Sequence, residues 1–232
     1  MTIAILEAGH PPAGLDKRFG SYADMTAALL GAEGRARTYR ITQGEWPASP
    51  DAHTAFAVTG SAAGVYEPLP WIAPLLAFLR AARGRAKLVG FCFGHQAIAQ
   101  AFGGHVEKVE RGWGLGLQRY ATHGSPFGAG GTIALAAIHQ DQVVAPPPDA
   151  ELVLANAFTP YAGLRYGEEA LTVQPHPEFA PDYAAALYTA LADRLGAESA
   201  QAAEASLAER DDREHVAAAL RAFLAKPLRA AA

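Results

Sequence analysis

The sequence is poor in the residues that mark several common classes of protein. Its 232 residues include a single cysteine, Cys92, which excludes an intrachain disulfide framework and a zinc site built from several cysteines. The 19 basic and 23 acidic residues are interspersed and sum to a net charge of −4. The chain therefore lacks the basic patch or stripe that nucleic-acid binding requires. A single cysteine also fits a reducing compartment.

Long apolar runs are missing as well. No uncharged apolar stretch reaches the roughly 18 residues of a membrane-spanning helix. The beginning of the chain, MTIAILEAGH, has neither the basic region nor the long apolar region of a signal peptide. Half of the residues are nevertheless apolar, enough for one well-buried core. We find no internal repeat and no linker, so we predict a cytoplasmic protein with one domain over residues 1–232 and no membrane contact.

The first hundred residues alternate short apolar runs with longer amphipathic segments. Continuous apolar runs suit strands buried on both faces, and they occur at 2–6, 55–60 and 87–91. Helical patterns that end at glycines occur at 22–32, 71–84 and 93–104. Strands and helices that alternate at this spacing predict an α/β fold with a doubly wound, mostly parallel sheet. In this order, the run at 87–91 is the third strand.

After about residue 105 the pattern changes. Strand-like runs with short connections between them predict hairpins, and hence an antiparallel extension of the sheet. These runs lie at 132–138, 151–157, 161–166 and 170–174, and three prolines at 146–148 mark a turn or extended loop.

From Pro181 onward the chain has a helical composition. One helix is predicted over 181–196, opening with proline and stopping at Gly196. One or two alanine-rich helices follow over 199–225, and the last residues, 229–232, are expected to fray. We expect this part, about 181–232, to form a C-terminal helical extension of the domain.

The only cysteine lies in the segment GFCFG, where the run at 87–91 gives way to a helical pattern. The spacing Gly-x-nucleophile-x-Gly is typical of a sharp strand-to-helix turn, because bulky residues at Gly90 and Gly94 would collide across it. Such a turn presents its apex side chain at the carboxyl edge of the sheet. The N–H of Phe93 opens the helix, where it can stabilise an anion. A lone cysteine is also commonly a buried, inert core residue, so this segment alone leaves two interpretations open.

A histidine between two prolines provides a partner for this cysteine. His176 lies in the segment TVQPHPEF, where the prolines favour extended backbone and His176 and Glu178 project to the same side. A carboxylate on one imidazole nitrogen fixes the tautomer and leaves the other nitrogen as a base. We therefore predict a catalytic triad of Cys92, His176 and Glu178. A metal site that adds His139 and Asp141 is an alternative, but it leaves the glycine-flanked cysteine unexplained.

Several segments taken together resemble the class I, or triad, glutamine amidotransferases. They are GFCFGHQ and PHPEF, with VTGSAAGVYEPLPW (58–71), ERGWGLG (110–116) and IHQDQV (138–143). The chain is most similar to stand-alone members, which include glutamine amidotransferase-like proteins and the plant γ-glutamyl peptidases. The resemblance implies a flavodoxin-like fold, a small-molecule substrate (glutamine or another γ-glutamyl compound) and no cofactor or metal.

The resemblance also implies a mechanism. In this family the cysteine attacks the side-chain amide of glutamine, so Cys92 would form a γ-glutamyl thioester while His176 relays protons and Glu178 orients the imidazole. The oxyanion would be held by backbone N–H groups, those of Phe93 and of Gly60 or Ser61. The residues that the resemblance places around the substrate are Gln96, Gly112, Trp113, His139, Gln140 and Asp141.

Some of these residues also have structural interpretations. Gln96 can make an internal hydrogen bond, Trp113 can belong to the core or a lid, and Asp141 can cap a short helix. His95 faces elsewhere on its helix, and we expect it to be structural.

The ammonia acceptor is not specified by the sequence. The residues after 180 are too few and too rich in alanine for a second enzyme, and no phosphate loop of the G-x-x-x-x-G-K type is present. Either a separate synthase subunit supplies the acceptor, or water is the acceptor and γ-glutamyl compounds are hydrolysed.

Two other hypotheses differ in class. The first is a thiol hydrolase of the dienelactone-hydrolase type, with Cys92, Asp141 and His176 as nucleophile, acid and base. The second is a subunit that senses glutamine or γ-glutamyl compounds without turnover. The PHPEF and GHQ contexts argue against the first, and the intact cysteine, histidine and glutamate argue against the second.

Overall fold

The computed structural model of the chain describes residues 2–124 and 126–228. Its strands are β1 (Ile3–Glu7), β2 (Arg37–Arg40), β3 (Ala55–Val58), β4 (Lys87–Phe91), β5 (His105–Lys108), β6 (Gly114–Thr122), β7 (Thr132–His139), β8 (Asp141–Ala145), β9 (Glu151–Ala155), β10 (Gly163–Tyr166) and β11 (Ala170–Val173). Its helices are α1 (Leu15–Phe19), α2 (Tyr22–Leu29), the 3₁₀ helix η1 (Ile41–Gln43), α3 (Ile72–Ala82), α4 (Phe93–Ala101), α5 (Pro181–Ala190), α6 (Ala192–Leu195), α7 (Ala197–Ser206) and α8 (Arg213–Ala225).

A nine-stranded sheet organises the fold, in the order β2-β1-β3-β4-β11-β10-β9-β6-β7. The strands from β2 to β11 pair in parallel, which confirms the predicted doubly wound α/β sheet. The segment at 87–91 is β4, the fourth strand in the chain and not the third. The prediction missed β2 because this edge strand, RTYR, is exposed or half-buried along its length and carries no apolar run.

The other half of the sheet is antiparallel, as predicted. β10, β9, β6 and β7 follow β11 with antiparallel pairing throughout. The prediction missed β6, whose first residues, Gly114 to Leu117, alternate glycine with leucine, and glycine is depleted in strands. β5 and β8 form a separate two-stranded antiparallel sheet, and neither was predicted.

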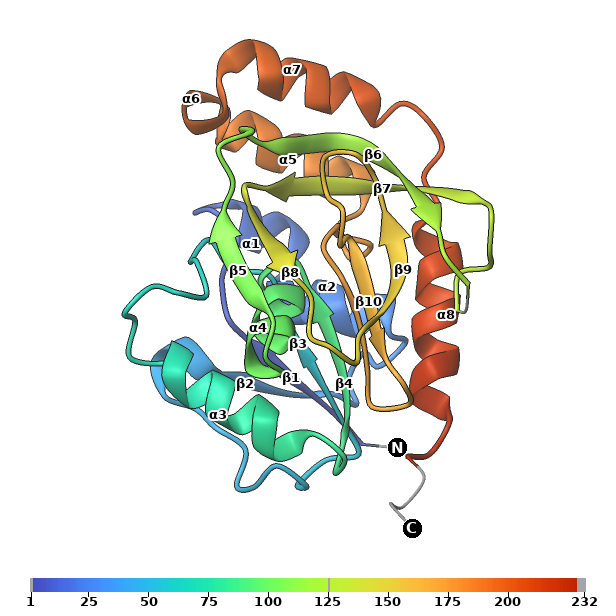
Figure 1. Cartoon of the computed structure of the whole chain (residues 1–232). Helices are drawn as coiled ribbons and strands as arrows, with labels where there is room; N and C mark the ends of the chain where they lie inside the picture. The colour runs from blue at the N-terminus through green and yellow to red at the C-terminus, as the bar shows by residue number, and fades with distance from the viewer. Residues whose placement is uncertain (1, 125, 229–232) are drawn as a thin grey trace.

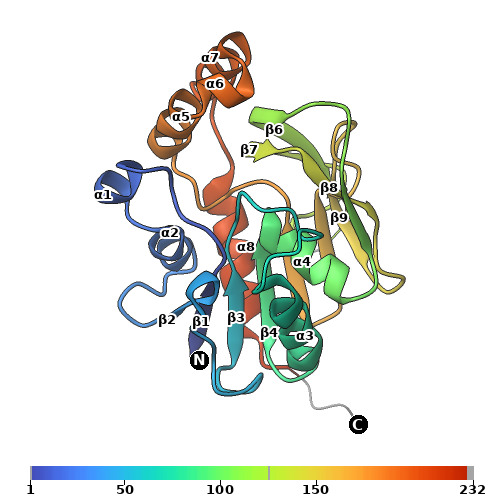
Figure 2. The same ribbon diagram turned by 90° about the vertical axis from the view of Figure 1, so that its left-hand side faces the viewer.

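Helices cover both faces of the parallel strands (Figures 1 and 2). Alternate residues of β1 serve the two faces, as the strand period requires. Ile3 and Ile5 pack in the core shared with α2 and α8, whereas Ala4 and Leu6 pack in the core shared with α3 and α4. The active-site candidates in the turn after β4 are therefore held between two packed layers.

The C-terminal part differs from its prediction in one place. The helix predicted over 181–196 is divided at Leu191, whose φ of −107° and ψ of 12° separate α5 from α6. No proline or glycine marks this break, so the sequence pattern does not reveal it. The predicted fraying at 229–232 lies outside the described residues. Within the described residues, no helix is long and apolar enough to cross a membrane.

Candidate active site

β4 ends in a sharp turn whose apex is Cys92. With a φ of 49° and a ψ of −103°, it is the only non-glycine residue of positive φ in the described part of the chain. A Cβ at Gly90 would lie 2.5 Å from the Gly94 carbonyl, and a Cβ at Gly94 would lie 2.2 Å from the oxygen of Val58. Only glycine fits at either position, so bulkier residues would collide across the turn, as expected from the sequence. Strain of this kind costs about 1–3 kcal/mol and clusters at functional sites.

His176 reaches the same edge of the sheet from β11. β11 pairs in parallel with β4, with Val173 beside Phe91, so the segments that follow the two strands emerge side by side. The N–H of His176 donates to the carbonyl of Ala136 at 2.8 Å. Its ring stacks on Phe179, with the two centroids 4.1 Å apart and the planes 5° from parallel. The position and the plane of the imidazole are therefore both fixed.

A carboxylate holds the imidazole from behind. Nδ1 of His176 lies 2.8 Å from Oε1 of Glu178, and the two side chains are only 4% and 2% exposed. The two residues thus project together, as the extended backbone predicts. Nε2 of His176 has no hydrogen-bond partner among the described residues, so this nitrogen is available for proton transfer.

Gly60 shows how close the imidazole lies to the cysteine. A Cβ placed on Gly60 would come within 3.1 Å of Cε1 of His176 and 3.9 Å of Cβ of Cys92. Both side chains therefore lie against the same glycine, and both line one cavity of about 440 Å³. Cys92 is only 6% exposed, but it lines this cavity and lies against the same glycine as the imidazole, which favours the pairing over an inert core position.

The electrostatics of the two buried histidines in this cavity are opposite. Burial, the largest single influence, lowers the pKa of His176, but Glu178 and Cys92 together outweigh it and raise this pKa to about 10. Burial and the charge of His176 lower the pKa of His139 to about 3. At neutral pH, His176 is therefore a cation with a proton to give, and His139 is neutral.

Glu178→Gln is expected to lower the pKa of His176, because Glu178 is the strongest of the influences that raise it. The pKa of His176 in the folded state lies above the ordinary value of 6.5. The His176–Glu178 pair therefore contributes its full stabilisation below pH 6.5 and loses this contribution as the pH rises through about 10. An NMR titration of the imidazole measures the pKa. The difference in unfolding free energy between the wild type and the variant should shrink over the same pH range.

Asp141→Asn is the matched control for this titration. The Asp141 carboxylate accepts a hydrogen bond from the hydroxyl of Tyr66 at 3.1 Å and is not among the influences on His176. The pKa of His176 should therefore stay in place. A larger fall in Asp141→Asn than in Glu178→Gln would instead support the thiol-hydrolase alternative, in which Asp141 orients the histidine.

Two backbone N–H groups belong to segments next to the cysteine. Phe93 is the first residue of α4, so its N–H has no acceptor within the helix. On the other side, the hydroxyl of Thr59 donates to the carbonyl of Gly60 at 3.1 Å and accepts from the N–H of Ala8 at 2.9 Å. In a trans peptide the N–H points opposite to the carbonyl. The N–H of Ser61 is thereby aimed away from Thr59, in a fixed orientation.

Comparison with known proteins agrees with the resemblance noted in the sequence. The family model described as glutamine amidotransferase class-I matches residues 62–190. A glutamine amidotransferase-like protein of Schizosaccharomyces pombe is 30% identical over 78% of this chain and 80% of its own. This chain belongs to the class-I glutamine amidotransferase family. Gamma-glutamyl peptidase 4 of Arabidopsis thaliana is 28% identical over 72% of this chain and 71% of its own. The crystal structure of a glutamine amido transferase from Methylobacillus flagellatus matches with a TM-score of 0.74 at 18% identity, covering 100% of this chain and 96% of that chain.

Most residues that the resemblance places around an amidotransferase substrate do line the cavity of Cys92. Those that line it are Gln96, Trp113, His139, Gln140 and Asp141, whereas Gly112 is not among the lining residues. The nitrogen of Gln96 donates to the carbonyl of Asp141 at 2.8 Å and to Oε1 of Gln174 at 3.0 Å. The structural interpretation of Gln96 therefore holds for its nitrogen, and only its carbonyl oxygen is left for a substrate.

The structure also tests the structural roles expected for Asp141 and His95. Asp141 begins β8, so the expectation that it caps a short helix is wrong. His95 lies as expected, fully buried, with Nδ1 2.8 Å from the hydroxyl of Thr172. The alternative metal site finds no support, because the described residues contain no group of three or more His, Cys, Asp or Glu placed to hold a metal.

The sequence did not point to several residues that line the cavity of Cys92. They are Tyr22, Tyr66, Lys108, Leu187, Leu191 and Arg194, among others. Tyr66 is the one exposed large hydrophobic residue of the described chain, at 53%. The last three follow the spacing i, i+4, i+7, which in the continuous helix predicted from the sequence indicates a shared surface, although the helix is in fact divided at Leu191. The spacing does not show which surface they face.

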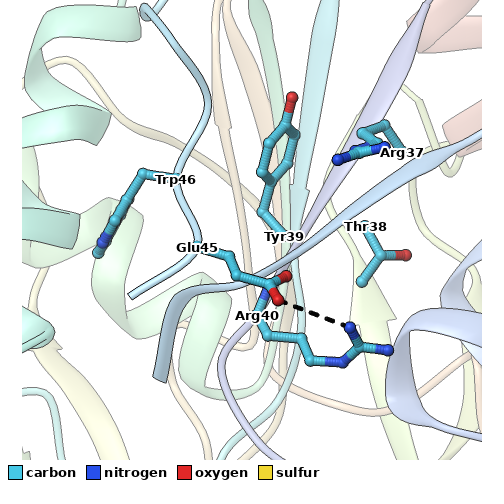
Figure 3. A pocket seen from close by; sticks show the side chains of 6 residues that line it. All are labelled: Arg37, Thr38, Tyr39, Arg40, Glu45 and Trp46. Carbon is cyan, nitrogen blue, oxygen red and sulfur yellow. Dashed lines mark hydrogen bonds and ion pairs between the residues drawn. The ribbon is translucent and has the colours of Figure 1, made fainter. Parts of the chain in front are cut away.

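A second hollow, of about 460 Å³, lies along β2 (Figure 3). Its lining contains neither cysteine nor histidine. Its Arg40 lies 3.8 Å from Glu45 and 3.9 Å from the buried Glu7, so the charge of this arginine is already balanced. This second hollow therefore contains none of the predicted catalytic residues.

Proposed function

We propose that the protein hydrolyses the γ-amide of glutamine through a γ-glutamyl thioester on Cys92. The observation that carries this proposal is the position of Cys92, in a strained turn and against the buried His176–Glu178 pair. A nucleophile, a base beside it and a group that orients the base are the requirements for thiol catalysis. Family membership supplies independent support.

The reaction would proceed in two halves. In the reactive state the proton of Cys92 resides on His176, in keeping with the raised pKa of this imidazole. The sulfur attacks the amide carbon, and the carbonyl oxygen becomes an oxyanion held by the N–H groups of Phe93 and Ser61 or Gly60. Collapse of the tetrahedral intermediate breaks the C–N bond, and His176 gives its proton to the leaving ammonia. Water, deprotonated by the now neutral His176, then attacks the thioester, and glutamate leaves as the Cys92 thiolate and the His176 cation re-form.

A second candidate is the hydrolysis of γ-glutamyl peptides, in which an amine rather than ammonia leaves. The Arabidopsis relative named gamma-glutamyl peptidase 4 favours it, because the match covers 71% of that protein. The steps at Cys92 are the same for both substrates. In the amidotransferase version, a separate synthase subunit would consume the ammonia. In the peptidase version, water is the only acceptor.

The direct test is to incubate the purified chain with glutamine and, separately, with γ-glutamyl dipeptides. Glutamate release from either, with ammonia or the free amine, supports the proposal and tells the two candidates apart. Cys92 is the only cysteine, so a glutamine-like electrophile should add one label to the chain. The absence of both turnover and labelling of Cys92 would reject the thiol mechanism and favour a sensing role.

Thr59→Val is expected to lower kcat by roughly 10- to 100-fold with little change in KM, because the oxyanion donor at Ser61 loses its orientation but is not itself removed, and removal of a donor costs about 10²–10³. Valine keeps the shape of threonine and lacks the hydroxyl that holds the carbonyl of Gly60. Thr59→Ser is the matched control and should retain most of the activity. Equal kcat values for the two variants would show that the hydroxyl does not orient the donor.

A further inference from the structure

The helices α5 and α6 form one wall of the cavity of Cys92, and this wall includes Arg194. Leu187 of α5, Leu191 at the break between the two helices and Arg194 of α6 line the cavity. The guanidinium of Arg194 lies 5.1 Å from the ring centroid of Trp113, which lines the same cavity. A planar guanidinium over an indole is attracted to the ring and limited in orientation. In the described part of the chain, Arg194 makes no salt bridge.

A carboxylate shares this region of the cavity. Burial raises the pKa of the Asp141 carboxyl above its usual range, while the charges of Lys108 and Arg194 act in the opposite direction. The anion and the two cations are thus close enough to influence one another, although none of them is paired by a salt bridge in the described chain. The cavity lining therefore carries charges of both signs within electrostatic range of one another, Glu67 among the anions, together with the leucines of its apolar wall.

A γ-glutamyl compound likewise carries one positive and one negative charge close together, at the end of the molecule remote from the scissile bond. Its α-ammonium and α-carboxylate groups are attached to one carbon, so a site that binds both needs an anion and a cation near each other. The cation that binds a carboxylate best is a guanidinium, because its N–H groups match both carboxylate oxygens, whereas an ammonium acts as a point charge. This chemistry selects Arg194 over Lys108.

We propose that Arg194, stacked on Trp113, binds the α-carboxylate of the γ-glutamyl substrate and makes the cavity selective for γ-glutamyl compounds over analogues that lack this group. The inference rests on the proposed function for the identity of the substrate. It adds a specificity-determining residue from the C-terminal helices, outside the segments in which the sequence showed a resemblance.

The test measures binding in the Cys92→Ala chain, where no turnover occurs. Glutamine is compared with 4-aminobutanamide, which has the same amide and amine but lacks the α-carboxylate. Arg194→Gln should weaken the binding of glutamine by about 10- to 100-fold, the usual range for a hydrogen bond to a charged group, and leave 4-aminobutanamide unaffected. Arg194→Lys should restore part of the loss. Calorimetry or competition with a fluorescent γ-glutamyl ligand provides the dissociation constants.

Three results would overturn the inference. The first is no loss of glutamine binding in Arg194→Gln. The second is an equal loss for both ligands, which would indicate a structural role. The third is a selectivity that disappears in Lys108→Gln but persists in Arg194→Gln. As a control, Arg80→Gln changes an exposed arginine on α3 and should bind both ligands as the parent chain does.

A pair of dipeptides distinguishes the two carboxylates of a longer substrate. γ-Glutamylglycine and its C-terminal amide share the α-carboxylate and differ only at the leaving group. Arg194→Gln should weaken both equally, and a loss confined to γ-glutamylglycine would reject the α-carboxylate assignment. Binding is measured in Cys92→Ala and hydrolysis in the wild type, so the two proposals can fail separately. Selective binding through Arg194 without hydrolysis of glutamine or γ-glutamyl peptides by the wild type would reject the proposed hydrolysis alone.

Discussion

Cys92→Ala is expected to lower the rate of γ-glutamyl hydrolysis by about 10⁴- to 10⁶-fold, because a nucleophile and its base act as one unit and the loss of either removes nearly all of its effect. Alanine keeps a Cβ at the φ of 49°, so the variant preserves the strained turn and removes only the sulfur. Glutamate release from glutamine or a γ-glutamyl dipeptide measures the rate. Intact mass after treatment with a glutamine-like electrophile should show a label on the wild type and none on the variant.

Cys92→Gly is the matched control for the turn itself. It should be as inactive as Cys92→Ala but more stable by about 1–2 kcal/mol, because glycine adopts a positive φ without the steric cost that a Cβ imposes. Denaturant unfolding of the two variants measures this difference. Substantial glutamate release from either variant would show that the sulfur is not the nucleophile.

His176→Gln is the second change with a large expected effect, about 10⁴-fold or more in kcat. The substitution removes the imidazole whose pKa is raised to about 10, which in the proposed mechanism holds the proton of Cys92 and gives it to the leaving ammonia. The exposed His105 lies on β5, so His105→Gln should keep wild-type activity. Thermal unfolding of both variants separates loss of chemistry from loss of fold.

The double variant Cys92→Ala/His176→Gln distinguishes a catalytic unit from two independent contributions. If the cysteine and the histidine act together, the double variant should be no slower than Cys92→Ala alone. Multiplication of the two single effects would mean that His176 acts on the substrate independently of the thiol. The comparison needs only the residual rates of the three variants, measured with the same substrate.

The turn at Cys92 and the pairing of His176 with Glu178 could be predicted because neighbouring residues decide them. Gly90 and Gly94 are required by clashes within one turn and with the strand beside it. The prolines around His176 restrict the backbone before them, so the direction of the imidazole and the carboxylate follows from local geometry. The parallel pairing of β11 with β4, which brings the two segments together, was not predicted, because the run at 170–174 was expected to belong to the antiparallel extension.

Contacts between distant segments decided the rest. β2 is an exposed edge strand without an apolar run, and the break at Leu191 has no proline or glycine to mark it. The nitrogen of Gln96 is used by Gln174, a residue 78 positions away. The sequence by itself determined the turn at Cys92, the pairing of His176 with Glu178 and the parallel sheet that carries the turn. Only the tertiary structure decided which side chains surround them, Arg194 on Trp113 among these, because a side chain far along the chain finds its neighbours through packing and not through any local pattern.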